Sequence, residues 1–338
     1  MPLGTEKNTL LGAAGAAGGA GERGVQVGSG RVGYRDVMQY ITIDTLGDAT
    51  DFGDLLTDQV SAQGCTSNAA NDRGIMNGLG NYGGTNFETI EYITISSTGN
   101  SADFGNSFDP ADNKAAASNG TNERACFMGG GPTTEYTGSP RQDVISYLTM
   151  SSLGDSSDFG NMAHDRSAAQ GLSNGTNERM LAACGRWYWP SQASLNHIEY
   201  ITINSAGNGT DFGDYNVSLG YNYASGTSND TNDRGVWAGG FVGWPHNTTQ
   251  DRISYVTITS TGDVSDFGNL ITARSVANEV SSGTSERAVW GGGAVGEGAS
   301  FPINMDYVTI NSTGDASDFG DLLSGGWGDS HGLSNMCP

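Results

Sequence analysis

The sequence predicts an all-β protein, a six-bladed β-propeller of four-stranded antiparallel blades. The tripeptide Asp-Phe-Gly occurs six times, and its phenylalanines are 52 to 55 residues apart. Each copy follows a segment similar to Tyr-Ile-Thr-Ile-x-Ser-Thr-Gly-Asp, and each repeat also contains an acidic residue followed by arginine. Three markers recurring in phase indicate an internal repeat of about fifty residues, which is a propeller period.

These markers are expected to form the structural core of the blades. The phenylalanines are Phe52, Phe104, Phe159, Phe212, Phe267 and Phe319, and the arginines are Arg23, Arg73, Arg124, Arg179, Arg234 and Arg287. We expect each phenylalanine to fill the space between adjacent blades. We expect each arginine to bridge blades by hydrogen bonds to carbonyls or acids, and a ring of arginines around a ligand is the alternative.

One repeat contains four predicted strands. Strand A lies around Ser225–Ser228, and strand B begins at Arg234 and ends at a diglycine. Strand C starts at Ile253 and carries apolar residues on both faces, so it should be buried between neighbouring blades. Strand D contains Asp-Phe-Gly. Four antiparallel strands of this length make one blade.

The two ends of the chain match complementary parts of one blade. Residues 332–335 (Gly-Leu-Ser-Asn) repeat the strand A sequence of residues 171–174, and residues 22–25 resemble the strand B sequence of residues 233–236. Pairing of these terminal strands would close the ring without an exposed sheet edge. We therefore expect one domain over 21–338. Residues 1–20 are Gly/Ala-rich and form an N-terminal arm or tail.

Composition and charge exclude several functions. The 53 glycines leave little room for long helices, and a formal net charge of −22 disfavours binding to nucleic acid. Residues 1–20 lack the pattern of a signal peptide, so we expect neither secretion by that route nor a membrane span. The four cysteines are far apart and are expected to be buried free thiols.

The acidic turns before Asp-Phe-Gly contain carboxylates that are candidate calcium ligands. Several carboxylates lie close together in each short loop, and calcium prefers such oxygen ligands. Aspartate also caps tight turns through its own side chain, which is the favoured interpretation. We expect no cofactor, with structural calcium as the lesser alternative. The candidate ligands are Asp48, Asp51, Asp263, Asp266, Asp315 and Asp318.

A recognition surface is expected on one face of the disc. The A–B and C–D turns are nearly identical between repeats, whereas the B–C and D–A loops on the opposite face vary in length and content. These variable loops contain many aromatic residues, which suit sugar or protein contacts. Packing over the ends of their own blades is the alternative. The candidate contact residues are Trp187, Tyr188, Trp189, Trp244, Tyr136, Phe241 and Phe301, and Tyr215 also falls in these loops.

No constellation of catalytic residues is present in the sequence. The four histidines, His164, His197, His246 and His331, fall in different loops without metal-ligand spacing. There is no P-loop. Paired carboxylates for glycoside cleavage remain open because aspartate is abundant.

The diglycine after strand B, the following Tyr strand and the period near fifty resemble kelch repeats. The longer consensus ending in Asp-Phe-Gly is similar to kelch-like repeats in tail-fibre and other virion proteins of marine and freshwater bacteriophages. The resemblance covers roughly residues 21–336. It departs from eukaryotic kelch proteins because only Trp237 and Trp290 provide a tryptophan on strand B.

The resemblance implies a structural or adhesive protein of a virion or extracellular fibre. Its expected partners are other subunits of that assembly and cell-surface glycan, and its expected location is the virion or an extracellular assembly. A free-standing carbohydrate-binding module is the second hypothesis, and a glycan-degrading enzyme is the third.

Overall fold

The structure is a computed structural model. It describes residues 22–28, 36–57, 61–62, 64–80, 88–131, 142–187, 193–215, 221–242, 248–275, 277–296, 300–323 and 331–338. The predicted arm at 1–20 lies outside these residues.

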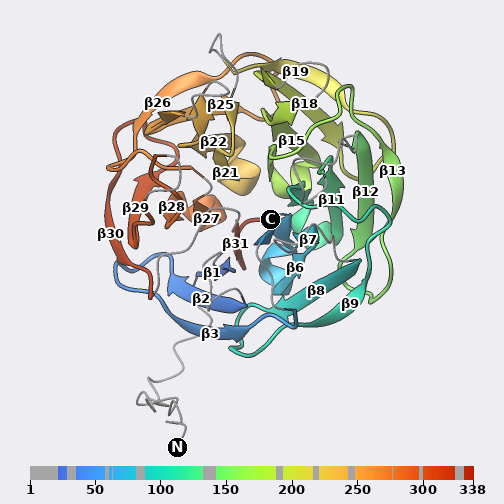
Figure 1. Cartoon of the computed structure of the whole chain (residues 1–338), viewed down its shortest axis with the longest axis horizontal. Helices are drawn as coiled ribbons and strands as arrows, with labels where there is room; N and C mark the ends of the chain where they lie inside the picture. The colour runs from blue at the N-terminus through green and yellow to red at the C-terminus, as the bar shows by residue number, and fades with distance from the viewer. Residues whose placement is uncertain are drawn as a thin grey trace, which may run out of the picture.

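In the described part of the chain, six four-stranded antiparallel sheets stand around a central axis as the blades of a propeller (Figure 1). The predicted fold is therefore confirmed. Strands A to D follow one another from the axis to the rim of every blade. Blade 1 contains β31 and β1–β3, and blades 2 to 6 follow in chain order.

The strands have the following bounds. Strand A is β31 (His331–Ser334), β5 (Cys65–Ser67), β10 (Ala115–Ser118), β14 (Gln170–Ser173), β21 (Ser225–Ser228) and β27 (Asn278–Ser281) in blades 1 to 6. Strand B is β1 (Arg23–Val27), β6 (Arg73–Met76), β11 (Arg124–Met128), β15 (Arg179–Ala183), β22 (Arg234–Ala238) and β28 (Arg287–Gly291). Strand C is β2 (Val37–Thr42), β8 (Thr89–Thr94), β12 (Val144–Thr149), β18 (His197–Thr202), β25 (Arg252–Thr257) and β29 (Asn304–Thr309). Strand D is β3 (Thr50–Asp54), β9 (Ala102–Asn106), β13 (Ser157–Asn161), β19 (Thr210–Asp214), β26 (Ser265–Asn269) and β30 (Ser317–Asp321).

Short elements lie in the connections. Five 3-10 helices join strands A and B: η1 (Ala69–Asn71), η2 (Gly120–Asn122), η3 (Gly175–Asn177), η4 (Asp230–Asn232) and η5 (Gly283–Ser285). Two-residue strands extend other connections: β4 (Ser61–Ala62), β7 (Leu79–Gly80), β16 (Arg186–Trp187), β17 (Ala193–Ser194), β20 (Tyr221–Asn222), β23 (Phe241–Val242) and β24 (Thr248–Thr249). None of the helices in the described residues is long and apolar enough to cross a membrane.

The ring closes as the terminal sequences predict. Strand β31 pairs antiparallel with β1, with Leu333 opposite Val25. The amide of Arg23 donates to Asn335 Oδ1 at 2.8 Å, and the amide of Asn335 donates back to the carbonyl of Arg23 at 3.1 Å. Residues at opposite ends of the chain thus complete blade 1 (Figure 1).

Strand D carries a β-bulge at the repeated tripeptide. In blade 5, Ile253 faces Gly268 and the next residue of β25 faces Asp266, so Phe267 is the extra residue. The same register shift recurs between strands C and D of the other five blades. A bulge redirects its extra side chain, and all six phenylalanines are buried, with 2–4% of each side chain exposed.

Each bulged phenylalanine packs against the strand C tyrosine of its own blade. The ring centroids are 5.9–6.3 Å apart in an edge-to-face arrangement. The repeated arginine covers the tyrosine, with its guanidinium carbon 4.2–4.9 Å from the ring centroid. Its Nη1 donates to a carbonyl of the next blade at 2.7–3.2 Å. Each arginine therefore connects two blades.

A second ring of contacts surrounds the axis. Every strand A ends in a serine, and its Oγ donates to the carbonyl of the equivalent serine of the neighbouring blade at 2.5–2.7 Å. The six serines are Ser67, Ser118, Ser173, Ser228, Ser281 and Ser334. The bond from Ser67 to Ser334 joins blade 2 to blade 1 and completes the circle.

Candidate functional site

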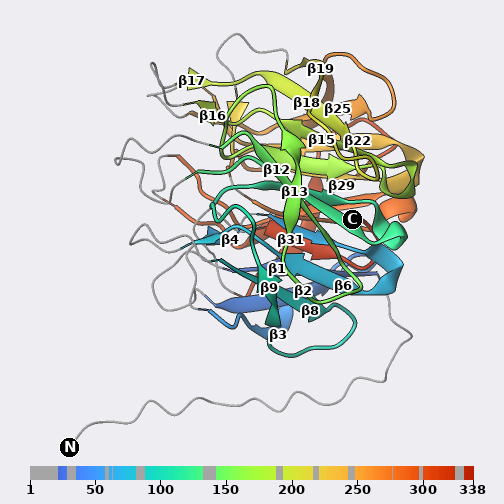
Figure 2. The same ribbon diagram turned by 90° about the vertical axis from the view of Figure 1, so that its right-hand side faces the viewer.

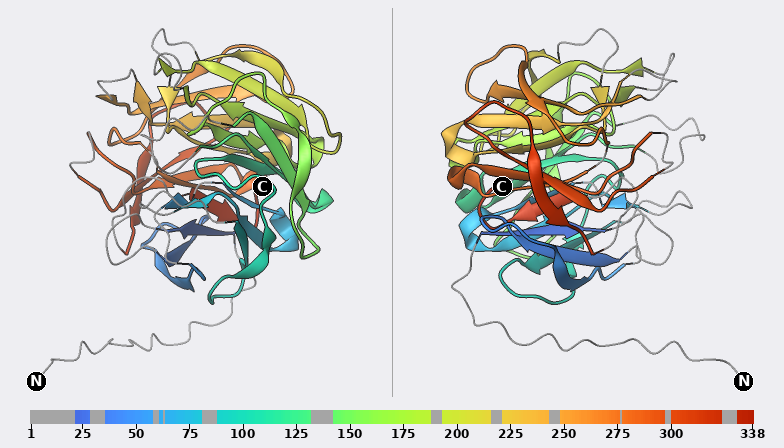
Figure 3. Two further views of the ribbon diagram at one scale, coloured as in Figure 1. Left: turned by 45° about the vertical axis from the view of Figure 1, so that its right-hand side comes forward. Right: turned by 90° about the vertical axis from the view of Figure 1, so that its left-hand side faces the viewer.

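The two faces of the disc differ in their construction. The turn face carries the 3-10 helices and the C–D turns, and the loop face carries the B–C and D–A connections. Figure 2 shows the 3-10 helices on the opposite side from β4, β16 and β17, and the two views of Figure 3 show the same separation. A ligand-binding surface has to be sought separately on each face.

On the turn face, the repeated polar residues bind one another. The acidic residue before each arginine has a left-handed backbone at the five described 3-10 turns, with φ of 71–74°. Its carboxylate accepts from an asparagine of the preceding blade in four cases, for example from Asn119 Nδ2 to Glu178 at 2.9 Å. These side chains are used to join blades.

The aspartates considered for calcium also serve the contacts between blades. Oδ1 of Asp48, Asp263 and Asp315 accepts a backbone amide from strand D of the preceding blade at 2.9–3.0 Å. Asp51, Asp266 and Asp318 are exposed on the rim. The described residues contain no group of three or more His, Cys, Asp or Glu side chains that could hold a metal ion.

The loop face is built differently in different blades. Strands β4 and β7 form a small sheet beside blade 2, β16 and β17 form one beside blade 4, and β20, β23 and β24 form a three-stranded sheet. The last sheet joins the D–A connection between blades 4 and 5 to the B–C connection of blade 5.

An aromatic cluster lies where blades 4 and 5 meet on the loop face. It consists of Arg186, Tyr223 and Phe241, from three separate connections. The guanidinium carbon of Arg186 is 4.5 Å from the centroid of Tyr223, and Nη2 of Arg186 donates to the tyrosine hydroxyl. The rings of Tyr223 and Phe241 are edge-to-face at 6.2 Å. Both rings are half-buried, so each still presents part of its surface to solvent.

The cluster is held rigidly from its sides. Arg186 is only 8% exposed, and the neighbouring Asn222 donates from Nδ2 to Ser194 Oγ of β17 at 2.6 Å. Tyr223 has a left-handed backbone with φ of 56°, as do Asn113 and Ala168 at the equivalent positions of other blades. The blade scaffold therefore sets the direction of the tyrosine.

Only part of the predicted contact set can be placed. Phe241 is in the aromatic cluster, and Phe301 is half-buried in the B–C connection of blade 6. Trp187 is on β16, where only its backbone is described, and Tyr188, Trp189, Trp244 and Tyr136 lie outside the described residues. Tyr215 belongs to the core instead, because it is 1% exposed and packs on Trp237 at 6.1 Å.

Sequence reasoning missed the buried ion pairs beneath the loop face. Arg166 pairs with Glu199, and Arg274 pairs with Asp306 at 3.3 Å between Nη2 and Oδ1. Both arginines also donate to two main-chain carbonyls of the following blade. Their burial lowers the arginine pKa, which the partner carboxylate counteracts. The sequence signal that could have revealed these ion pairs is an acidic residue directly before the strand C tyrosine.

The thiols are buried and protonated. Burial raises the pKa of Cys65, Cys126 and Cys184 and raises that of Cys337 to about 11. A thiol in this state is a poor nucleophile.

The comparisons with known proteins add no family to this fold. No protein-family model matches the chain, and a search of curated proteins found no match.

Proposed function

We propose that this chain is a non-enzymatic structural or adhesive protein of a virion or an extracellular fibre. Its loop face would contact a cell-surface glycan or a neighbouring subunit. The observation that carries the proposal is the contrast between the faces: repeated contacts between blades occupy the turn face, whereas the loop face differs from blade to blade. The resemblance to kelch-like virion repeats supports the same biological setting.

The aromatic cluster is the described part of the loop face that best suits such a contact. Half-buried rings offer apolar area with little conformational entropy left to lose, and glycan and protein ligands both use such rings. Because Arg186 supports Tyr223 from the side, the ring is oriented before any ligand arrives. The preorganisation lowers the cost of binding.

Binding to candidate host cells tests the proposal. We expect Phe241→Ala, and separately the double variant Trp187→Ala/Trp189→Ala, to weaken binding of the purified protein at least tenfold. Leu153→Ala is the matched control, because Leu153 is 59% exposed on the turn face. Unchanged binding in both loop-face variants, or equal loss in the control, would contradict an adhesive loop face.

The same samples separate the alternative functions. Incorporation into particles or fibres distinguishes a structural subunit from a free-standing carbohydrate-binding module, which would bind glycan without assembling. Release of reducing sugar from host polysaccharide by the unmodified protein would replace the proposal with a glycan-degrading enzyme.

A further inference from the structure

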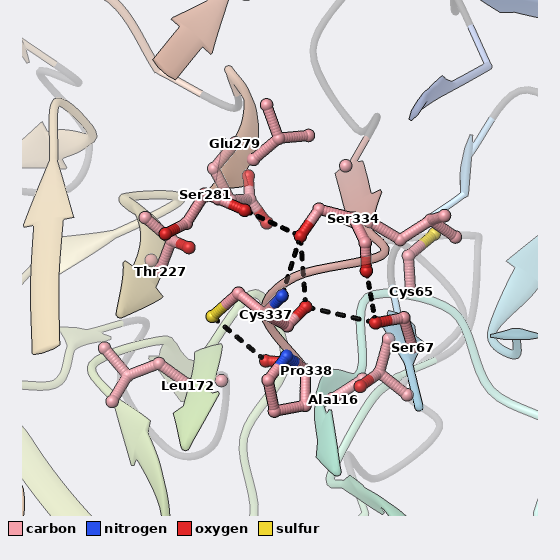
Figure 4. A pocket seen from close by; sticks show the side chains of 16 residues that line it. Cys65, Ser67, Ala116, Leu172, Thr227, Glu279, Ser281, Ser334, Cys337 and Pro338 are labelled. Atoms are coloured by element: carbon pink, nitrogen blue, oxygen red, sulfur yellow. Dashed lines mark hydrogen bonds between the residues drawn. The ribbon is translucent and has the colours of Figure 1, made fainter. Parts of the chain in front are cut away.

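The axis of the ring contains a small cavity of about 30 Å³. Every strand A contributes to its lining the residue that lies two positions before the ring serine. These residues are Cys65, Ala116, Gly171, Gly226, Glu279 and Gly332. Figure 4 shows labelled lining residues from several blades around this space. A volume of this size accommodates one or two water molecules or a small ion.

The wall of the cavity is polar because of the strand register. Leu333 faces Val25, and the amide of Asn335 bonds to the carbonyl of Arg23. Hydrogen-bonded positions alternate along an antiparallel pair, so the peptide groups of Gly332 and Ser334 point away from β1. The carbonyl of Ser334 accordingly accepts from Ser67 of the next blade. The other blades have the same register.

Small residues keep this part of the axis open while the strands pack closely. A Cβ on Gly332 would lie 1.9 Å from the carbonyl oxygen of Glu279, and one on Gly171 would lie 2.4 Å from that of Ala116. Cys337 and Pro338 line the cavity beside the serine ring. The Cys337 amide donates to Ser334 Oγ at 3.0 Å, and Ser67 Oγ donates to the Cys337 carbonyl at 3.1 Å.

Glu279 is the one acidic side chain among the lining residues, and it is 7% exposed. Its Oε1 is 2.8 Å from Nδ1 of His331, whereas its Oε2 has no hydrogen-bond partner among the described residues. Thr66 also lines the cavity, and its buried Oγ1 has no partner there. An unpaired buried carboxylate oxygen is costly, and both of these atoms are oxygen ligands.

We propose that the axial cavity binds a small inorganic cation that prefers oxygen ligands, held by Glu279 and retaining part of its water. The carboxylate supplies the negative charge, and the inward peptide groups and Thr66 suit the remaining waters. Glu279, His331 and Thr66 belong to blades 6, 1 and 2. The ion would therefore stabilise the region where the terminal strands close the ring.

Crystallography with anomalous scattering tests the site directly. Crystals of the full chain are soaked in rubidium chloride, calcium chloride or choline chloride, which distinguishes a monovalent from a divalent site and provides a blank. We expect an anomalous peak on the axis next to Glu279 with rubidium or calcium. An axis that contains only ordered water in every soak would overturn the proposal.

Thermal unfolding provides the matched comparison in solution. Titration of sodium, potassium or calcium chloride into a choline buffer should raise the Tm of the unmodified protein saturably, by about 4 °C at a hundred times Kd. Glu279→Gln should lose this rise, and Asp318→Asn on the exposed rim should keep it. If Tm rises equally in all three proteins, the added salt is only screening charges in general, and the proposed site is rejected. If Glu279→Gln does not fold, the anomalous maps of the unmodified protein decide alone.

Discussion

At the scale of single residues, neighbouring blades approach closely where the residue at the contact is glycine, which has no side chain. The glycine of each Asp-Phe-Gly faces the carbonyl of a glycine in the C–D turn of the next blade. A Cβ at this position would lie 2.2–2.4 Å from that oxygen in all six blades. The glycine is therefore needed for packing between blades.

Two alanine substitutions at one seam separate packing from the general effect of replacing glycine. Gly105→Ala would place its Cβ 2.3 Å from the carbonyl oxygen of Gly154, whereas a Cβ at Gly154 meets nothing within 4 Å, and φ is 153° and 154° at these two glycines. Because the backbone strain is the same at both positions, we expect Gly105→Ala to lower the free energy of unfolding by about 1–3 kcal/mol more than Gly154→Ala does. Urea unfolding measures both, and equal effects would contradict the packing argument.

Glu279 should make stability depend on pH. Burial raises the pKa of its carboxyl above the ordinary value of 4.5, and His331 only partly offsets this. The folded state thus keeps a proton that the unfolded chain has lost, so stability decreases as pH rises from about 4.5 through the raised pKa. In a buffer without small metal cations, urea unfolding should show a shallower decrease for Glu279→Gln. The same slope in both proteins would mean that Glu279 does not contribute.

At the scale of elements, each blade is tied to the next at several radii. The serine ring lies next to the axis, the arginine bonds lie farther out, and the C–D turn bonds to strand D at the rim. Bonds at these three radii fix the tilt of each blade. A propeller of short strands can therefore be rigid without long helices.

Removal of one serine hydroxyl tests the contribution of the inner ring. Ser173 Oγ donates to the carbonyl of Ser118 at 2.7 Å and accepts from the amide of Gly175 at 3.2 Å. Ser173→Ala leaves both buried groups without this partner, and we expect a loss of about 1–3 kcal/mol in the free energy of unfolding. Ser205→Ala, in an exposed C–D turn, should be nearly neutral. If Ser173→Ala leaves the free energy of unfolding unchanged, the serine ring contributes little to stability.

At the scale of the whole molecule, the ring is closed by strands from opposite ends of the described chain. Strand A of blade 1 comes from residues 331–334, and strands B to D of that blade come from residues 23–54. Contacts of such large sequence separation carry a large loop-closure entropy, and the pairing of β31 with β1 is the contact that joins the first blade to the end of the chain. Cooperative unfolding should therefore depend on β31.

Truncation separates ring closure from the N-terminal segment. Deletion of residues 331–338 removes β31 and exposes the edge of β1, so we expect loss of cooperative thermal unfolding and association of the opened ring. Residues 1–20 precede the first strand, so their deletion should leave the unfolding transition unchanged. Circular dichroism and light scattering measure both effects. A fully cooperative, monomeric 331–338 deletion would show that closure does not stabilise the ring.

Much of the architecture could be predicted because its signals are local and repeated six times. Strands A and B of blade 5 begin at the expected residues, and strand C begins at Arg252, one residue before the expected Ile253. The bulge at Phe267 was not predicted, because a side chain's alternation along one strand does not reveal a shift against its partner. For the aromatic loops, the sequence left surface and core open, and the structure assigns Tyr215 to the core.

The sequence by itself determined the number of blades, the strands of each blade and the pairing of the two ends. The repeat period can be read directly from the sequence, and the two ends of the chain match strand A and strand B of one blade. Only the tertiary structure decided which polar side chains meet across the seams. Asp263 at an amide of blade 4, Ser173 in the serine ring and Glu279 on the axis all face partners many residues away. These contacts depend on the tilt and spacing of neighbouring blades, and the packing of the whole ring determines both.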